Sequence, residues 1–488
     1  MATLIHDFNF KNQTEAVSST TMVSDSWNPM AKAQEAKLHI AMFPWLAFGH
    51  IIPFLEYAKF LVQKGHRISF ISTPKNIDRL PKIPPELATS ITLVKIPLPK
   101  VKGLPENAEA TMDVRTEDVE HLKKAYDGLQ PELTRFLEDS VPDMIIYDFA
   151  PYWLPEAAAK LGISRVYFCI FNAWFFAFFG PTDMMVDGPD PRKKAEDFLV
   201  PPKWVPFKNK VAYKPFEANW MLSSAERNVS GVSDIYRAGK VVAGSDSILI
   251  RHCQEFEGAW LNLLGELHQK PFIPLGLMPP PTHVNGSDEK NETWDFISSW
   301  LEIQERGSVI YVALGSEVAL NQSHVTQLAL GLESSGLPFF WALRKPAGSN
   351  EPFELPDGYE ERVKGRGLVW KGWAPQMRIL SHESVGGFLT HCGWSSCVEG
   401  ILFGLPLVML PFLVDQGLNA RVLDDNGVGI EVPRDEETGS YKSDSVAESV
   451  RLIMVENDGK RRRERAKELS LIFGDRELHN SYLEKSIV

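Results

Sequence analysis

Short apolar runs alternate with stretches of helical periodicity along the chain from Lys37 onward. In the first half the apolar runs are LHIAMF, RISFIS, ITLVKI and MIIY, and the helical stretches lie at about Pro53 to Lys64 and at Glu117 to Leu137. Strands that are apolar throughout and separated by helices predict a parallel sheet covered on both faces. The pattern therefore predicts a doubly wound α/β domain over residues 37–278.

A second series with the same pattern follows a segment rich in Pro, Gly and Asp at residues 279–293, which predicts a linker. Its apolar runs are SVIYVALGS, FFWALR, GLVWKGW, GGFLTH, PLVMLP and GIEV, with helices near 322–334, from about Trp394 and from Asp415. A second α/β domain is predicted over 294–470, and a final helix over 471–488 that packs back on the first domain. The length of 488 residues also favours two cores, and the polar residues 1–36 are predicted to be disordered.

Composition narrows the class of protein. The net charge of −12 argues against an extended nucleic-acid surface. The four cysteines have neither a disulfide framework nor zinc-ligand spacing, which favours a reducing compartment. The most apolar run, Val166 to Gly180, has 15 residues, fewer than the roughly 20 that span a bilayer, and is predicted to be interior. Because no secretory signal is recognised either, we expect a soluble cytoplasmic protein without a transmembrane segment.

The stretch HCGWSSCVEG, residues 391–400, is the strongest candidate for a binding site. It follows the run GGFLT and opens a helix, and ligands of parallel sheets bind at the carboxyl ends of strands. The unpaired N–H groups and the dipole of a helix start favour an anion such as a diphosphate. Ser395 and Ser396 are equally explained as ordinary helix caps, and Glu399 either as a ribose ligand or as dipole compensation. The chain contains no Gly-x-Gly-x-x-Gly after the first strand of either half and no P-loop, which disfavours dinucleotide and P-loop chemistry.

Trp373 and Gln376, in the stretch WAPQ, supply an indole and an amide suited to a pyrimidine, although an isolated Trp is more often a core residue. The 44 residues from Trp373 to Gln416 resemble the signature box of plant family 1 UDP-dependent glycosyltransferases, in length as well as in residues. The stretches GHIIPF, LGSEV and FWALRKP extend the resemblance over nearly the whole chain from Lys37. The resemblance implies a GT-B fold, in which two doubly wound Rossmann-like domains face a cleft.

The resemblance also implies which residues bind a UDP-sugar donor. The base, the ribose, the diphosphate and the sugar would be held by Ser316, Trp373, Gln376, His391, Ser395, Ser396, Glu399, Asp415 and Gln416, together with the backbone of Ala374 and Trp394. A terminal glutamine, here Gln416, resembles the glucose-using members. One position departs from the family, since Ser395 stands where Asn is usual. Serine keeps a hydrogen-bond donor there on a shorter side chain.

Within the resemblance His50 is the general base that takes the proton of the acceptor hydroxyl, and Asp148 orients and stabilises its imidazole. The residues alone leave open that His50 is simply satisfied in a strand-to-helix loop. The implied reaction is a direct displacement that inverts the anomeric carbon, with UDP-glucose as co-substrate and no metal or cofactor. A nucleotide-sugar binding protein without turnover is the alternative from another class.

The acceptor is expected to be a small-molecule glycoside. The stretches FPWLAFGH, EATMDV, DGLQPELTRFLE, PPKWVPF and VALGSEVAL resemble the branch that adds a sugar to an existing sugar, typified by steviol glycoside β-1,2-glucosyltransferases. Candidate acceptor contacts are Trp45, Phe48, Trp174 and Phe175, for which burial in the core is the other interpretation. An aglycone glycosyltransferase, or a member that uses UDP-rhamnose or UDP-xylose, is the alternative within the family. A monomer without a nucleic-acid partner is expected.

Overall fold

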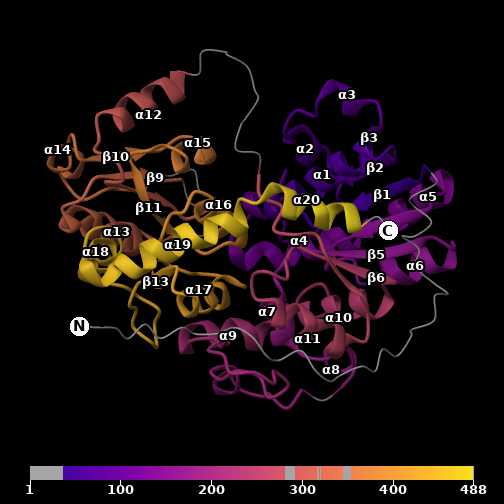
Figure 1. The fold of residues 1–488 in the computed structure, drawn as a ribbon. Helices are drawn as coiled ribbons and strands as arrows, with labels where there is room; N and C mark the ends of the chain where they lie inside the picture. Colours follow the sequence, from indigo (N-terminus) through magenta and orange to yellow (C-terminus); the bar gives the residue numbers. More distant parts are fainter. Residues whose placement is uncertain are drawn as a thin grey trace, which may run out of the picture.

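Two parallel sheets, each with its own helices, form two lobes of the molecule (Figure 1). The computed structural model describes residues 37–188, 190–280, 292–315, 318, 320–344 and 353–486. We call the first sheet with its helices the N-terminal lobe and the second the C-terminal lobe. Residues 1–36, predicted to be disordered, and residues 281–291 of the predicted linker 279–293 lie outside the described residues.

The strands of both sheets run parallel throughout. The seven-stranded sheet has the order β3-β2-β1-β4-β5-β6-β7, and the six-stranded sheet the order β10-β9-β8-β11-β12-β13. The strands of the N-terminal lobe are β1 (His39–Phe43), β2 (Arg67–Ser72), β3 (Ile91–Lys95), β4 (Met144–Tyr147), β5 (Ser164–Cys169), β6 (Ser247–Ile250) and β7 (Phe272–Pro274). Those of the C-terminal lobe are β8 (Val309–Ala313), β9 (Phe339–Ala342), β10 (Gly367–Trp370), β11 (Val385–Thr390), β12 (Leu407–Met409) and β13 (Gly429–Glu431).

Helices connect the strands. In the N-terminal lobe they are α1 (Phe48–Gln63), α2 (Pro74–Asp78), α3 (Pro85–Ala88), α4 (Val119–Asp127), α5 (Gln130–Ser140), α6 (Leu154–Lys160), α7 (Ala173–Phe179), α8 (Thr182–Val186), α9 (Pro215–Ser224), α10 (Asp234–Gly244) and α11 (Gly258–His268). From the C-terminal lobe to the chain end they are α12 (Glu292–Glu302), α13 (Gln322–Ser335), α14 (Tyr359–Arg362), α15 (Gln376–Leu380), α16 (Trp394–Leu402), α17 (Gln416–Asp425), α18 (Ser443–Met454), α19 (Lys460–Phe473) and α20 (Arg476–Lys485).

Both faces of each sheet are buried, as the apolar runs predict. In β1, Ile40 and Met42 pack into one cluster of buried residues, whereas Ala41 and Phe43 pack into another. Alternate residues of β8 divide in the same way between two clusters. Because successive side chains of a strand point to opposite faces, this division requires layers on both sides of the sheet. The predicted fold of two doubly wound α/β units is confirmed.

Three expectations about elements need correction. The first helix begins at Phe48 rather than near Pro53, so that the proline, usually found in a first turn, lies inside α1 and His50 belongs to the helix. The predicted helix at 117–137 is broken, because α4 ends before Gly128 and a new helix, α5, begins at Gln130 with Pro131 in its first turn. The apolar run from Val166 is buried as predicted, but it comprises the end of β5 and then α7.

The chain end returns to the N-terminal lobe. Helix α19 packs on α16 in the C-terminal lobe, and α20, drawn in yellow, continues from it to the other lobe (Figure 1). There the hydroxyls of Ser486 and Tyr57 lie 2.9 Å apart, and the hydroxyl of Tyr482 accepts a hydrogen bond from the backbone of Gln254 at 2.9 Å. No helix within the described ranges combines the length and apolar character needed to span a membrane.

Candidate functional site

His50 and Asp148 form a buried hydrogen-bonded pair at the carboxyl edge of the first sheet. His50 lies in the first turn of α1, and Asp148 follows the last residue of β4. The His50 Nδ1 is 2.7 Å from Asp148 Oδ2, and Asp148 is fully buried. The backbone N–H groups of Trp45 and Phe149 donate to the two carboxylate oxygens at 3.1 and 2.7 Å. These donors fix the carboxylate, which in turn favours the tautomer with the proton on Nδ1 and a basic Nε2.

Aromatic rings surround the His50 imidazole. Phe171 meets it edge-on with ring centroids 5.4 Å apart, and Phe149 is tilted at 5.7 Å. Trp45 contacts Phe149, and Phe175 contacts Phe171, so that two of the predicted acceptor residues belong to this cluster. Both are buried, as Trp174 is, which favours packing behind the first ring layer over direct acceptor contact. Phe48, a third, is half-buried at the start of α1. The cluster supplies an apolar wall beside the candidate base.

The stretch that sequence analysis singled out forms a tight turn from β11 into α16. His391 follows β11, Cys392 has a positive φ of 66°, and Gly393 is the residue before the first turn of α16. The His391 ring lies between two glycines: a Cβ on Gly315 or on Gly393 would be only 2.5 Å from its Nε2. Glycine at both positions therefore allows the imidazole to lie beside the helix start.

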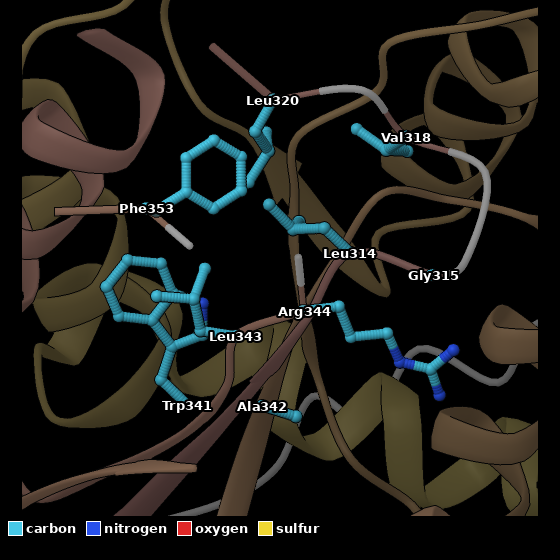
Figure 2. Close-up of a pocket in the computed structure, with 9 residues that line it drawn as sticks. All are labelled: Leu314, Gly315, Val318, Leu320, Trp341, Ala342, Leu343, Arg344 and Phe353. Atoms are coloured by element: carbon cyan, nitrogen blue, oxygen red, sulfur yellow. The ribbon is translucent and has the colours of Figure 1, made fainter. Parts of the chain in front are cut away.

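The His391 imidazole is neutral. Burial lowers its pKa to about 4, and the charge of Arg344 acts in the same direction. Arg344 follows β9, beside a pocket lined by apolar residues such as Leu314, Trp341 and Phe353. In Figure 2 its guanidinium points away from those apolar side chains. Because an uncharged imidazole carries one N–H, His391 can donate one hydrogen bond to an anion at this edge.

Glu399, in the second turn of α16, faces Gln376, the first residue of α15. Gln376 Nε2 donates to Glu399 Oε2 at 2.5 Å and lies 3.5 Å from the Ser396 hydroxyl. The hydroxyl of Tyr311 donates to the Gln376 carbonyl oxygen at 3.2 Å, which fixes the orientation of the amide. Burial raises the pKa of Glu399, while the bond from Gln376 and the charge of Arg251 lower it in part. A carboxylate held in this way can accept hydrogen bonds from a pair of neighbouring hydroxyls.

The indole of Trp373 is available for stacking. Its side chain belongs to the exposed large hydrophobic residues, at 66% exposed. Its backbone oxygen accepts a hydrogen bond from the Trp370 indole at 2.9 Å, and the neighbouring Ala374 is buried. An exposed aromatic ring held by its own backbone in this way can receive a flat base.

Gln416 and Asp415 begin α17 and are both nearly buried. The Gln416 Oε1 accepts hydrogen bonds from the backbone N–H groups of Phe412 and Leu413, each at 2.9 Å. With the oxygen used in this way, the side-chain NH2 is the group that Gln416 can offer to a ligand. Oδ2 of Asp415 accepts from Nδ2 of Asn419 at 2.8 Å.

Three hydrogen bonds between the lobes at this site were not predicted from the sequence. Arg251, which follows β6, donates to the Ser395 hydroxyl at 2.6 Å. Asn419 of α17 accepts from the Trp174 indole at 2.9 Å and from Asn172 at 2.5 Å. These pairings depend on how the lobes meet, and no local spacing in the sequence indicates them.

The remaining predicted residues have different surroundings. The Trp394 side chain is buried and meets Trp174 edge-on with ring centroids 5.0 Å apart. Trp174 is itself fully buried between the lobes, which favours packing over an acceptor contact. Ser316 lies outside the described residues. Over the described ranges no group of three or more His, Cys, Asp or Glu side chains could hold a metal ion.

The comparisons with known proteins agree with this geometry. Residues 273–480 match the family described as "UDP-glucoronosyl and UDP-glucosyl transferase". The chain is 52% identical to UDP-glycosyltransferase 91D1 of Stevia rebaudiana over 454 residues, 92% of each chain. It is 42% identical to the soyasaponin III rhamnosyltransferase of Glycine max, over 93% of this chain and 96% of that protein. The crystal structure of Glycyrrhiza uralensis UGT73P12 superposes with a TM-score of 0.75 at 22% identity, covering 93% of this chain and 95% of that one.

The fold and the relatives together define the class of protein: an inverting glycosyltransferase of GT-B fold that uses a UDP-sugar. The chain belongs to the plant family 1 UDP-glycosyltransferases. Binding of a UDP-sugar donor and of an acceptor follows from that membership.

Proposed function

We propose that the protein transfers glucose from UDP-glucose to a hydroxyl on the existing sugar of a small-molecule plant glycoside, forming a β-glycosidic bond. The observation that carries the proposal is the His50–Asp148 pair, 2.7 Å apart, with its aromatic wall at the carboxyl edge of the first sheet. A buried base with a fixed tautomer suits removal of a proton from an alcohol.

The proposed reaction is a single displacement at the anomeric carbon of the donor sugar. The acceptor oxygen forms a bond to the anomeric carbon as the bond from that carbon to the β-phosphate oxygen of UDP breaks. The proton of the acceptor hydroxyl goes to Nε2 of His50, and the leaving electron pair stays on UDP. The α16 helix start, with His391 and Ser396 as donors, would stabilise the charge that develops on the diphosphate.

In the proposed donor complex, Trp373 stacks on the uracil ring, Gln376 lies at its edge, and Glu399 accepts the ribose hydroxyls. Asp415 and the NH2 group of Gln416 would hold the sugar. The arrangement supports this assignment because Trp373 is exposed, whereas Glu399 and Gln416 are held by hydrogen bonds within the protein. A sugar already present on the acceptor is supported by the resemblance of the acceptor-side stretches to the branch that adds a sugar to an existing sugar.

UDP-rhamnose is the second candidate donor, because the similarity to the soyasaponin III rhamnosyltransferase favours it. The test is mass spectrometry of products from matched pairs of an aglycone and its monoglucoside, each with UDP-glucose, UDP-rhamnose and UDP-xylose. We expect a mass increase of one hexose on the monoglucoside with UDP-glucose. Products from the aglycone alone would contradict the acceptor, and products from UDP-rhamnose alone would contradict the donor.

The His50→Ala variant serves as the control for catalysis. It removes the proposed base without touching the proposed donor site, so we expect product formation to be lost and UDP binding to be kept. Product formed at the wild-type rate by this variant would contradict the role of His50.

A further inference from the structure

Arg251 is a buried cation at the boundary between the lobes. It follows the last residue of β6, at the same carboxyl edge of the first sheet as Asp148, and is 4% exposed. Within the part of the chain that the structure describes, no carboxylate lies within ion-pair distance of its guanidinium. Buried arginines are normally paired with an anion, as Arg237 is with Asp127.

The partners that Arg251 does have are neutral oxygens. Its Nε donates to the Leu277 carbonyl at 2.7 Å and one terminal nitrogen to the Met278 carbonyl at 3.4 Å. Its other terminal nitrogen donates to the Ser395 hydroxyl at 2.6 Å. A guanidinium has five N–H donors, so this set does not saturate it and leaves its charge uncompensated.

The Arg251 side chain points towards the start of α16. Ser395 lies in the first turn of α16, and Figure 1 shows α16 on the side of its lobe that faces the N-terminal lobe. Glu399, four residues later on the same helix face, is near enough for its charge to act on Arg251. The guanidinium therefore lies against the helix start that is proposed for the diphosphate and near the carboxylate that is proposed for the ribose.

Arg251 keeps its positive charge at neutral pH and can therefore bind an anion. Burial lowers the pKa of Arg251 to about 10, and the charge of Glu399 acts in the opposite direction. The side chain thus remains protonated, and an anion placed beside it gains a charge-assisted hydrogen bond in a site from which water is largely excluded.

We propose that Arg251 is a ligand of the UDP-sugar diphosphate, supplied by the N-terminal lobe and held against the helix start of α16 by Ser395. The inference rests on the proposed donor site. It gives a reason for serine at position 395, because the short hydroxyl leaves room for the guanidinium and accepts its hydrogen bond. A diphosphate bound between the two lobes would also join them, since one lobe supplies the helix start and the other the cation.

The experiment compares UDP with uridine, which lacks the phosphates, by isothermal titration calorimetry on the full chain. For Arg251→Gln we expect UDP binding to weaken at least tenfold, while uridine binding changes by no more than about threefold. Arg251→Lys keeps the charge but loses the planar set of guanidinium N–H donors, so it should recover part of the UDP affinity. If Arg251→Gln does not fold, Arg251→Lys alone should weaken UDP more than uridine.

The matched control is Arg165→Gln. Arg165 is paired with Asp246 at the amino edge of the same sheet, opposite the proposed site, and its loss should leave both affinities within about twofold. An equal loss for UDP and uridine in the Arg251 variants, or no loss, would overturn the role of Arg251 while the UDP-sugar site stands. Wild-type protein that binds UDP no more tightly than uridine would overturn both.

Discussion

Trp174 and Asn419 join the two lobes through a hydrogen bond of 2.9 Å between the indole Nε1 and the amide Oδ1. The Asn419 NH2 group faces the other way, donating to Asp415 at 2.8 Å and to the Cys392 carbonyl at 3.0 Å. A single buried amide therefore connects the lobe boundary to two segments of the proposed donor site. The orientation of its oxygen and nitrogen is fixed by these four partners, which include Asn172.

Asn419→Asp should disrupt these hydrogen bonds. The carboxylate would face the Asp415 carboxylate and the Cys392 carbonyl without a proton to donate, at a position that is fully buried. We expect a loss of about 2–5 kcal/mol of stability and a fall in kcat/KM for the UDP-sugar. Thermal unfolding and steady-state kinetics measure the two effects. Asn426→Asp, at the half-buried end of α17, is the control and should cost less; equal losses would remove the special role of Asn419.

Asp148→Asn should reduce turnover while leaving the donor site intact. Three N–H groups point at the carboxylate, from Trp45, Phe149 and the Nδ1-protonated His50, so an amide NH2 in either orientation meets a donor. We expect kcat to fall about 10²- to 10⁴-fold with little change in the Kd for UDP. Asp143→Asn, before the amino end of the same strand, is the matched control. A kcat near the wild-type value would show that the carboxylate does not orient the base.

Gly315→Ala should weaken UDP binding through His391. A methyl group at residue 315 would lie 2.5 Å from the His391 Nε2, so the imidazole must move from the helix start. We expect the Kd for UDP to rise about tenfold or more by calorimetry. Gly336→Ala is a close control, since its φ of +74° nearly equals the +73° of Gly315 but nothing lies within 4 Å of the added Cβ. If both variants bind UDP equally well, His391 is not part of the site.

Gln416→Glu should weaken the contact with the sugar of the donor without disturbing α17. One carboxylate oxygen can still accept from Phe412 and Leu413, but the group presented to the ligand no longer donates hydrogen bonds. We expect kcat/KM for UDP-glucose to fall about tenfold to hundredfold with the Kd for UDP unchanged. A parallel fall in UDP affinity would mean that residue 416 contacts the nucleotide instead.

The fold was predictable from the sequence where each strand is a distinct apolar run. β1, β2, β4 and the central strands β8, β11 and β12 of the second sheet stand between helical stretches, and their burial on both faces follows from composition. β5 was not distinguished as a strand, because only Asn172, which caps α7, separates its apolar run through Phe171 from the apolar residues of α7. β7 has three half-buried residues, too few to show any periodicity.

The candidate site was predictable where one local segment supplies its residues. His391, Ser396 and Glu399 lie on a single strand-turn-helix unit, so their spacing in the sequence already places them together. Arg251 and Ser395 are 144 residues apart, and only the docking of the lobes brings them into contact. An isolated arginine after a strand has no sequence signal that distinguishes a buried ligand from a surface charge.

Acid should destabilise the protein between about pH 6.5 and pH 4 through its buried histidines. Burial lowers the pKa of His252, His268 and His391 from 6.5 to about 4 in each case. Because the unfolded chain takes up these protons first, the stabilisation from each neutral imidazole is complete above about pH 6.5 and is lost as the pH falls towards 4. A pKa shift of this size corresponds to about 3 kcal/mol of folding stability for each histidine.

His268 offers the cleanest test, since it lies at the end of α11, outside the proposed site. His268→Gln removes one titration, so its unfolding midpoint, followed by circular dichroism at pH 4 to 7, should depend less steeply on pH than that of the wild type. Thr182→Val removes the hydroxyl that lies 2.8 Å from the His268 Nδ1 but keeps the titrating ring. It should lower the midpoint at every pH and keep the slope. A His268→Gln slope equal to that of the wild type would show that this imidazole is already protonated, or equally accessible, in the folded state.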